Sequence, residues 1–409
     1  MIPIAFEELE GLGLGELRGF GELTGLEIDS RRVRPGDLFV AIRGGREFVD
    51  DARERGAATL VPHDEYAAMG IIGELLRGRS SARFVGITGS TGKTSTKDIL
   101  AALCAPVVRT VANERSYNAE LGVPLTLGRL EPDTEVCILE LAMRGFGQIA
   151  ELCEIARPEI GVITNVGPAH LELVGSLEGV VRAKGELVAA LPPGGTAILP
   201  EEFPVERDDI EVVRLHEPEV VRHEGRTIVG GVSFNFTARH QAANAAAALA
   251  ALDSLGLPRP DRVDVDLSRW RGEESTLPGG GLLINDAYNA NPVSMRAALA
   301  YLVERAGSRR RVAILGEMAE LGPGAPSFHQ EIGVEAANDG VQALVAVGEL
   351  ARGYLEGAAG VPVTRWYPDA AAAAAAVDEV VEPGDCVLVK ASRALGLEVV
   401  AEALAAVRA

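Results

Sequence analysis

The stretch Arg83-Phe-Val-Gly-Ile-Thr-Gly-Ser-Thr-Gly-Lys93-Thr-Ser-Thr-Lys97 decides the fold of this chain. Its first residues, Arg83 to Ile87, are predicted to form a buried strand that runs directly into a glycine-rich loop. A helix is predicted from Lys93 to about Cys104, which places the loop at a helix N-terminus, where anions are favoured. A strand, a glycine loop and a helix in this order are typical of a phosphate-binding loop.

The residue types of the loop suit the phosphates of a nucleotide. Gly89 and Gly92 allow the backbone N–H groups to curl toward phosphate without a clashing Cβ. Lys93 can bridge β- and γ-phosphate oxygens, and the Thr94 hydroxyl can bind Mg²⁺. The glycine spacing is two residues shorter than in the general G-x-x-x-x-G-K-[ST] pattern, and a purely structural turn is the alternative. The predicted nucleotide-binding residues of the loop are Gly89, Ser90, Thr91, Gly92, Lys93, Thr94 and Ser95.

Two more polar side chains stand at the ends of predicted strands. Glu140 lies in Cys137-Ile-Leu-Glu-Leu141, and a carboxylate there suits Mg²⁺, a hard ion that prefers oxygen ligands. The alternative for Glu140 is an ordinary acid at a strand end. His170 follows the strand Ile160–Ile163 at the end where open α/β sheets place ligands. This position favours a metal or phosphate role for His170 over a surface or packing role.

Lysine is rare in this chain, because only Lys93, Lys97, Lys184 and Lys390 occur among 39 basic residues. Unlike arginine, lysine is a compact cation that can lose its proton and react. Lys184, on a predicted helix, has two interpretations: a salt bridge with Glu186 or Glu178, or a carbamate formed with CO₂ that serves as a metal ligand. At an ordinary pKa only about one lysine in a thousand is neutral at pH 7.4, so a carbamate requires a desolvated amine and a nearby cation. Lys97 is expected to be an ordinary surface residue.

Composition excludes several classes of protein. The 409 residues are 47% hydrophobic and 24% charged, as in globular proteins large enough for two or three cores. A net charge of −20 argues against sequence-independent nucleic-acid binding, which depends on neutralising phosphates. No apolar stretch is long enough to span a bilayer and no signal-peptide pattern occurs, so we expect a cytoplasmic protein without membrane insertion. The scattered cysteines are expected to be reduced and buried.

Short apolar runs alternate with helical patterns along most of the chain, which is typical of parallel βα units. The alternation restarts after Gly279-Gly-Gly281 and ends with the strand Cys386–Val389 and a final helix. The alanine run 370–376 follows Asp369 and is expected to be a helix with that residue as its N-cap. The chain is therefore predicted to be an α/β protein with three domains, at residues 1–80, 81–271 and 272–409.

Several of these segments together resemble a known family. Thr88-Gly-Ser-Thr-Gly-Lys-Thr-Ser95, the strand-end Glu140, Asn165-Val-Gly-Pro-Ala-His170 and Ala183-Lys184-Gly-Glu resemble the Mur ligases, the ATP-dependent amide ligases of peptidoglycan synthesis. The resemblance covers essentially the whole chain in the expected order. It implies a small UDP-binding α/β domain, a central P-loop ATPase domain with a parallel sheet, and a Rossmann-like C-terminal domain.

Three segments resemble the branch of the family that joins D-alanyl-D-alanine to UDP-N-acetylmuramoyl-tripeptide. They are Asn285-Asp-Ala-Tyr-Asn-Ala-Asn-Pro292, Leu315-Gly-Glu-Met-Ala-Glu-Leu-Gly322 and Leu388-Val-Lys-Ala-Ser-Arg393. The resemblance implies these two substrates and a reaction in which ATP converts the tripeptide carboxylate to an acyl phosphate. The amine of the dipeptide then attacks, and ADP and phosphate leave. We expect a monomer, although the sequence leaves the oligomeric state open.

The resemblance also implies roles for individual residues. Catalysis would involve Lys93, Lys184, His170 and Glu140, and two Mg²⁺ ions would be bound by Thr94, Glu140, His170 and carbamylated Lys184. Outside the loop, ATP would be bound by Asn244, Arg271, Asp286, Tyr288 and Asn289. The substrates would be bound by Ser30, Arg31, Asn118, Asn291, Lys390, Ser392 and Arg393.

Other functions stay open from the sequence. A P-loop ATPase or switch whose hydrolysis drives motion is the alternative of another class, and a folylpolyglutamate synthase or the sister Mur ligase is the related one. The sister enzyme typically carries an Asp-Asn-Pro-Arg motif, which this sequence lacks. The shortened segment Gly45–Asp51 lacks the usual Asp-x-His, which leaves its contact with the UDP substrate open. The third peptide residue is open between lysine and diaminopimelate.

Overall fold

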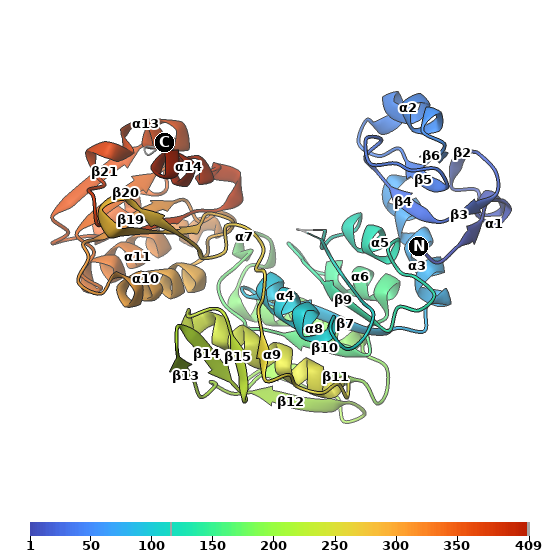
Figure 1. Cartoon of the computed structure of the whole chain (residues 1–409), viewed down its shortest axis with the longest axis horizontal. Helices are drawn as coiled ribbons and strands as arrows, with labels where there is room; N and C mark the ends of the chain where they lie inside the picture. Colours follow the sequence, from blue (N-terminus) through green and yellow to red (C-terminus); the bar gives the residue numbers. More distant parts are fainter. Residues whose placement is uncertain (115–116, 407–409) are drawn as a thin grey trace. The chain divides into compact units, whose positions relative to one another are not determined.

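The computed structural model describes residues 1–114 and 117–406, which fold into two compact units (Figure 1). The first unit comprises residues 1–165, 183–237 and 241–266, and the second comprises 166–182, 238–240 and the chain from Leu267 onward. Parallel strands alternate with helices in both units, so the predicted α/β class is confirmed. None of the helices in the described ranges is long and apolar enough to cross a membrane.

The central sheet of the first unit is parallel and has the strand order β12-β11-β10-β7-β9-β8. Its strands are β7 (Arg83–Thr88), β8 (Thr110–Ala112), β9 (Val136–Glu140), β10 (Ile160–Ile163), β11 (Thr196–Pro200) and β12 (Glu211–Leu215). Every residue of β9 and β10 is buried, as expected for a parallel sheet covered on both faces. Since β7 pairs with β9 on one side and β10 on the other, its carboxyl end lies at the switch point where such sheets bind ligands.

Helices connect these strands as the sequence predicts. α4 spans Lys93–Cys104 and buries Ile99, Leu100 and Leu103. The other helices that belong wholly or partly to this part of the unit are α5 (Gly122–Leu127), α6 (Gln148–Ala156), α8 (Leu177–Ala190) and α9 (Arg239–Ser254). A small sheet of order β13-β14-β15-β16 precedes and follows α9, with strands at Val221–His223, Arg226–Val229, Val232–Phe234 and Arg262–Val263.

The N-terminal part of the first unit has a mixed sheet of order β2-β6-β5-β4 and a short pair, β1-β3. These strands are β1 (Ile4–Ala5), β2 (Gly15–Arg18), β3 (Glu22–Leu23), β4 (Gly25–Glu27), β5 (Asp37–Val40) and β6 (Ala58–Pro62), with helices α1 (Phe6–Gly11), α2 (Val49–Glu54) and α3 (Glu65–Arg79). Arg77 of α3 donates to the Ala156 carbonyl at 2.7 Å and pairs with Glu159 at 2.8 Å. These bonds tie α3 to the strands and helices of the central sheet.

The second unit has one sheet of order β17-β18-β22-β19-β20-β21, parallel except for the edge strand β17. Its strands are β17 (Glu273–Leu277), β18 (Gly281–Asp286), β19 (Arg311–Gly316), β20 (Ala343–Val347), β21 (Val363–Tyr367) and β22 (Cys386–Lys390). Its helices are α7 (Leu171–Val174), α10 (Pro292–Ala306), α11 (Ala325–Asn338), α12 (Arg352–Gly357), α13 (Ala370–Ala376) and α14 (Glu398–Ala406). Figure 1 shows α10 and α11 on one face of the sheet and α13 and α14 on the other, and a separate hydrophobic core fills each interface.

Short-range predictions agree with these elements. The alanine run forms α13, and the Asp369 carboxylate accepts a hydrogen bond from Ala372 N at 2.8 Å as its N-cap. All four cysteines are free and buried. Burial raises the pKa of the Cys104 thiol to about 12, so this thiol stays protonated and unreactive at neutral pH.

The cap of α13 offers a test of this local structure. Replacing Asp369 with alanine should destabilise α13 by about 1 kcal/mol, because the Ala372 amide loses its acceptor. Amide hydrogen exchange within α13 should accelerate roughly fivefold, as that free energy implies. The control is Asp378→Ala, which alters an exposed aspartate nearby. Equal exchange rates in the two variants would show that the cap does not stabilise the helix.

Candidate functional site

The glycine loop takes a backbone path that only glycine accommodates. Gly89 has a φ of 153°, and a Cβ there would lie 1.9 Å from Thr164 Oγ1. Gly92 has a φ of 78°, and a Cβ there would lie 2.2 Å from Asn244 Oδ1. Both positions combine a left-handed or otherwise glycine-favouring backbone with a close neighbour. The loop therefore packs tightly between the end of β10 and helix α9.

Residues just after β10 hold the loop in place. The Thr91 N–H donates to Asn165 Oδ1 at 2.9 Å, and Asn165 Nδ2 donates to Thr91 Oγ1 at 2.6 Å. The Thr164 hydroxyl donates to the Thr91 carbonyl at 2.5 Å. Sequence reasoning did not assign these two supporting residues to the site, although their position directly after a strand was a signal. Lys93 closes the loop by donating from Nζ to the Gly89 carbonyl at 2.7 Å.

Glu140 joins the loop to the neighbouring strand. Its carboxylate is almost fully buried, with the residue 2% exposed, and Oε2 accepts from the Thr94 hydroxyl at 2.6 Å. Its other oxygen, Oε1, accepts from Asn118 Nδ2 at 2.8 Å. The structure thus brings together three of the predicted site residues: a hydroxyl, a carboxylate and an amide at the carboxyl ends of parallel strands.

The oxygen atoms of Thr94 and Glu140 fit a magnesium ion. Mg²⁺ is usually bound by one or two carboxylates together with substrate phosphates, and not by a full cage of protein ligands. No group of three or more histidine, cysteine, aspartate or glutamate side chains that could hold a metal ion occurs in residues 1–114 and 117–406. The hydroxyl and the carboxylate already lie within hydrogen-bond distance of each other, at the helix end that favours anions.

Lys184 of α8 is buried, with only 1% of the residue exposed. Burial lowers the pKa of its amine well below the ordinary value, and the nearby charge of Lys93 lowers it further. Glu186, one candidate partner, instead accepts hydrogen bonds from the backbone N–H groups of Gly147 at 2.7 Å and Ala150 at 3.1 Å. Within the described part of the chain no carboxylate pairs with Lys184, so the salt-bridge interpretation is wrong there.

Helix α9 places amide side chains beside the loop. Asn244 Nδ2 donates to Gln241 Oε1 at 2.9 Å, and Gln241 Nε2 donates to Ser95 Oγ at 3.4 Å. Asn244, predicted to contact the nucleotide, is therefore fixed by Gln241, which sequence reasoning did not single out. Both side chains are buried.

A second set of predicted residues gathers within the second unit, at the carboxyl ends of β18 and β22. Lys390 is 2% exposed, and its Nζ contacts Asp286 Oδ2 at 2.6 Å and the Asn289 carbonyl at 2.8 Å. The Arg271 guanidinium lies 4.1 Å from the centre of the Tyr288 ring. Its buried Nε has no hydrogen-bond partner in the described residues, which is a feature of a donor available to a ligand.

Three other predicted residues of this unit have structural contacts. Asn291 is the N-cap of α10, and its Oδ1 accepts from Ser294 N at 2.9 Å. Ser392 Oγ accepts from the Ala319 N–H at 2.9 Å. Arg393 forms an ion pair with Glu398, and its guanidinium lies 4.7 Å from the Trp270 ring centre. Of these three, Arg393 has the most solvent-exposed side chain.

His170 belongs to the second unit and has a left-handed backbone, with a φ of 57°. Its Nδ1 forms a hydrogen bond with the carboxylate of Glu320, which is also left-handed, with a φ of 61°. A carboxylate on one ring nitrogen fixes the tautomer and leaves the other nitrogen as the one suited to a ligand. Glu320 was not identified as a site residue from the sequence.

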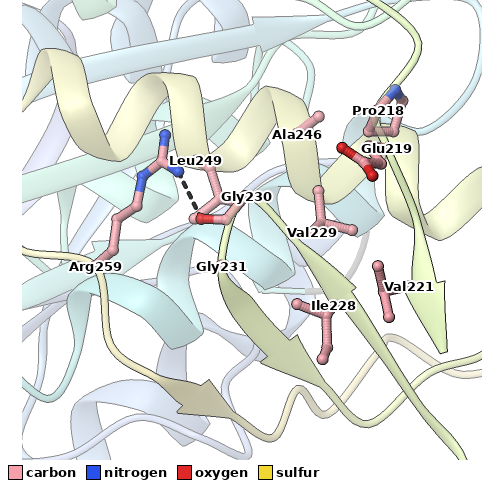
Figure 2. Close-up of a pocket in the computed structure, with 10 residues that line it drawn as sticks. All are labelled: Pro218, Glu219, Val221, Ile228, Val229, Gly230, Gly231, Ala246, Leu249 and Arg259. Atoms are coloured by element: carbon pink, nitrogen blue, oxygen red, sulfur yellow. Dashed lines mark hydrogen bonds between the residues drawn. The ribbon is translucent and has the colours of Figure 1, made fainter. Parts of the chain in front are cut away.

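Two cavities lie elsewhere in the first unit. One, of about 440 Å³, is lined mainly by apolar residues of β13, β14 and α9, and its Arg259 already donates to the Gly230 carbonyl at 2.8 Å (Figure 2). The other, of about 790 Å³, contains Arg31, the exposed predicted substrate residue that pairs with Asp29. Four more arginines line this second cavity, namely Arg32, Arg34, Arg109 and Arg129. Ser30, beside Arg31 in sequence, is buried.

Comparison with known families finds three matching models. The model of the Mur ligase middle domain matches residues 87–252, that of the Mur ligase glutamate ligase domain matches 271–393, and that of the Mur ligase family catalytic domain matches 22–92. The chain is 34% identical to the UDP-N-acetylmuramoyl-tripeptide–D-alanyl-D-alanine ligase of Synechocystis, with 92% of this chain and 91% of the relative covered. It is 32% identical to the Escherichia coli enzyme of the same name, with 85% and 87% covered.

Solved structures show the same similarity. The chain resembles a crystal structure of MurF from Acinetobacter baumannii, with a TM-score of 0.87, 26% identity, and 98% of this chain and 99% of that one covered. It also resembles MurF ligase from Thermotoga maritima in complex with ADP, with a TM-score of 0.80, 27% identity, and 93% and 96% covered.

The packing of the loop predicts the effect of a single methyl group. Gly92→Ala should weaken ADP binding at least roughly tenfold, which corresponds to about 1.4 kcal/mol, because its Cβ would displace Asn244 and distort the loop. Isothermal titration with ADP and Mg²⁺ measures this change. The control is Gly256→Ala, a position with a φ of 69° and no atom within 4 Å of the added Cβ. The control should lose some stability but keep its ADP affinity, and equal affinity in both variants would contradict the interpretation.

Proposed function

Since this chain belongs to the Mur ligase family, we propose that it is an ATP-dependent ligase that joins D-alanyl-D-alanine to UDP-N-acetylmuramoyl-tripeptide in the cytoplasm. The observation that carries this proposal is the cluster of half-buried Lys93 with buried Thr94 and Glu140 at the carboxyl ends of parallel strands. The names of the curated relatives and their nearly complete coverage of the chain support the choice of substrates.

The reaction requires two anions to approach each other. An oxygen of the tripeptide carboxylate attacks the γ-phosphorus of ATP, the bond to the ADP oxygen breaks, and an acyl phosphate forms. The dipeptide amine then attacks the acyl carbon, phosphate leaves, and the amine loses a proton. Lys93 and the loop N–H groups would reduce the repulsion between carboxylate and triphosphate, which is the kind of preorganised charge that contributes most to catalysis. Mg²⁺ bound by Thr94 and Glu140 would polarise the phosphoryl oxygens.

We also propose that Lys184 is carbamylated. Its buried position and lowered pKa leave more of the amine neutral at pH 7, and only a neutral amine attacks CO₂, forming a carbamate with release of one proton. The product is an anion in a buried place, so it needs a cation beside it. A second Mg²⁺ would supply that cation, with His170 as its other protein ligand.

The remaining residues are assigned to binding. We propose that residues 1–80 recognise the UDP moiety through Ser30 and Arg31, because positively charged side chains in the adjoining cavity suit a diphosphate. Asn244, Arg271 and Tyr288 would contact the adenosine side of ATP, with Asp286 and Asn289 near them. The domain at 81–271 would bind ATP, and the Rossmann-like domain at 272–409 would contribute residues to both the ATP site and the substrate site. Asn118, Asn291, Lys390, Ser392 and Arg393 would contact the substrates, in a monomeric enzyme.

Phosphate release with purified protein tests the ligase against an ATPase. Release should be negligible with ATP alone and should require both UDP-N-acetylmuramoyl-tripeptide and D-alanyl-D-alanine, because the γ-phosphoryl group is transferred to a carboxylate and not to water. Parallel assays with the lysine and the diaminopimelate tripeptides would assign the third residue. Sustained phosphate release with ATP alone would indicate a motor or switch ATPase instead.

The carbamate predicts an unusual pattern of rescue. Lys184→Ala should lower ligase turnover by roughly 100-fold, the order of effect expected when one preorganised charge is lost. Short carboxylates such as acetate should partly restore turnover by occupying the place of the carbamate. A ¹³C-carbamate signal should appear in the wild-type protein treated with ¹³C-bicarbonate and should be absent from the alanine variant. Full turnover by Lys184→Arg, which cannot form a carbamate, would exclude this role.

A further inference from the structure

Lys97 is not the surface residue that the sequence suggests. Only 3% of the residue is exposed, and its Nζ contacts two oxygens: the Asn113 carbonyl at 2.7 Å and Asp98 Oδ1 at 2.9 Å. Lys97 lies on α4, one helical turn after Thr94. Helix α4, which begins at the phosphate loop, therefore also contacts the chain directly after β8.

Asn113, the residue held by Lys97, fixes the end of β9. Its Oδ1 accepts from the Glu140 backbone N–H at 2.5 Å, and its Nδ2 donates to the Tyr117 carbonyl at 2.5 Å. The residue is buried and its own N–H donates to the Ile138 carbonyl at 3.3 Å. One side chain thus connects the strand end that bears Glu140 to the chain near Asn118.

Asn118 completes the connection to the carboxylate. It donates from Nδ2 to Glu140 Oε1 at 2.8 Å, while its own carbonyl accepts from the Ala142 N–H at 2.9 Å. Glu140 is consequently held at its backbone by Asn113, at one oxygen by Asn118 and at the other by Thr94. Lys97 anchors this arrangement by holding the Asn113 carbonyl.

We propose that Lys97 is a positioning residue that sets the Glu140 carboxylate and the Asn118 amide for the Mg²⁺-nucleotide and the substrate. The inference rests on the proposed function for the identity of the ligands. The hydrogen-bond network of Lys97, Asn113, Asn118 and Glu140 does not depend on that function. A lysine suits this position because its ammonium group is a compact point charge with three donors on a long stem. An arginine fork would need more room between α4 and the chain after β8, and this chain uses arginine almost everywhere else.

The first test measures the network without any ligand. In Lys97→Met, amide hydrogen exchange should accelerate at least roughly tenfold in peptides that contain Glu140 and Ala142, a loss of about 1.4 kcal/mol of local protection. Exchange in β7 should stay at the wild-type rate. Arg77→Met is the matched control, because it removes another largely buried cation with carbonyl and carboxylate partners in the same unit. That variant should lose stability without faster exchange at Glu140.

The second test measures the binding of ADP as a function of Mg²⁺ concentration. The Mg²⁺ concentration that gives half of the maximal gain in ADP affinity should rise at least fivefold in Lys97→Met and stay unchanged in Arg77→Met. ADP affinity without Mg²⁺ should change little, because the loop N–H groups and Lys93 stay in place. If Lys97→Met does not fold, Lys97→Gln replaces it, since this polar side chain ends one bond short of the lysine Nζ and should give the same two changes.

Wild-type exchange at Glu140 and a wild-type Mg²⁺ dependence in the folded variant would overturn the positioning role. A network that loosens in a protein that binds no nucleotide would instead support the role of Lys97 in fixing Glu140 and overturn the proposed function. Failure of the positioning role and failure of the proposed function therefore give different results.

Discussion

The close packing of the glycine loop against its neighbours is the constraint on which the rest of the site depends. Gly89 lies against Thr164, directly after β10, and Gly92 lies against Asn244 of α9, so a Cβ at either glycine would collide with these residues. The same contacts fix the direction of α4 and with it the positions of Thr94 and Lys97. The loop is thus held by the chain after β10 and by α9, and a fixed backbone path of this kind is what electrostatic preorganisation requires.

Buried lysines are the second common feature. Lys97, Lys184 and Lys390 are each at most 3% exposed, although burying a charge is costly unless partners compensate for it. Two of them have oxygen partners, at Asn113 and Asp98 for Lys97 and at Asp286 and Asn289 for Lys390. Lys184 has no carboxylate partner in the described residues, and its pKa is lowered. The lysine that lacks a partner is also the one to which we assign reactivity.

Local signals predicted much of this structure. The strand before the loop, the start of α4 at Lys93, the strand-end position of Glu140 and the cap of α13 all follow from short-range patterns, and the structure confirms them. Contacts between distant strands could not be predicted in this way. Asp286 and Lys390 are partners in the β18–β22 register although 104 residues separate them. The buried role of Lys97 likewise depends on where the chain after β8 passes, which no local pattern around α4 encodes.

The central claim is that the clustered charges promote transfer of a phosphoryl group to a carboxylate. Tripeptide nucleotide labelled with ¹⁸O in its terminal carboxylate tests that claim most directly, because the oxygen that attacks ATP leaves with the phosphate when the amide forms. Mass spectrometry of the phosphate released in the presence of D-alanyl-D-alanine should show one ¹⁸O atom for each amide bond formed. Unlabelled phosphate released while the amide forms, with the ¹⁸O atom that the carboxylate loses recovered in water, would contradict the acyl phosphate and the account built on it.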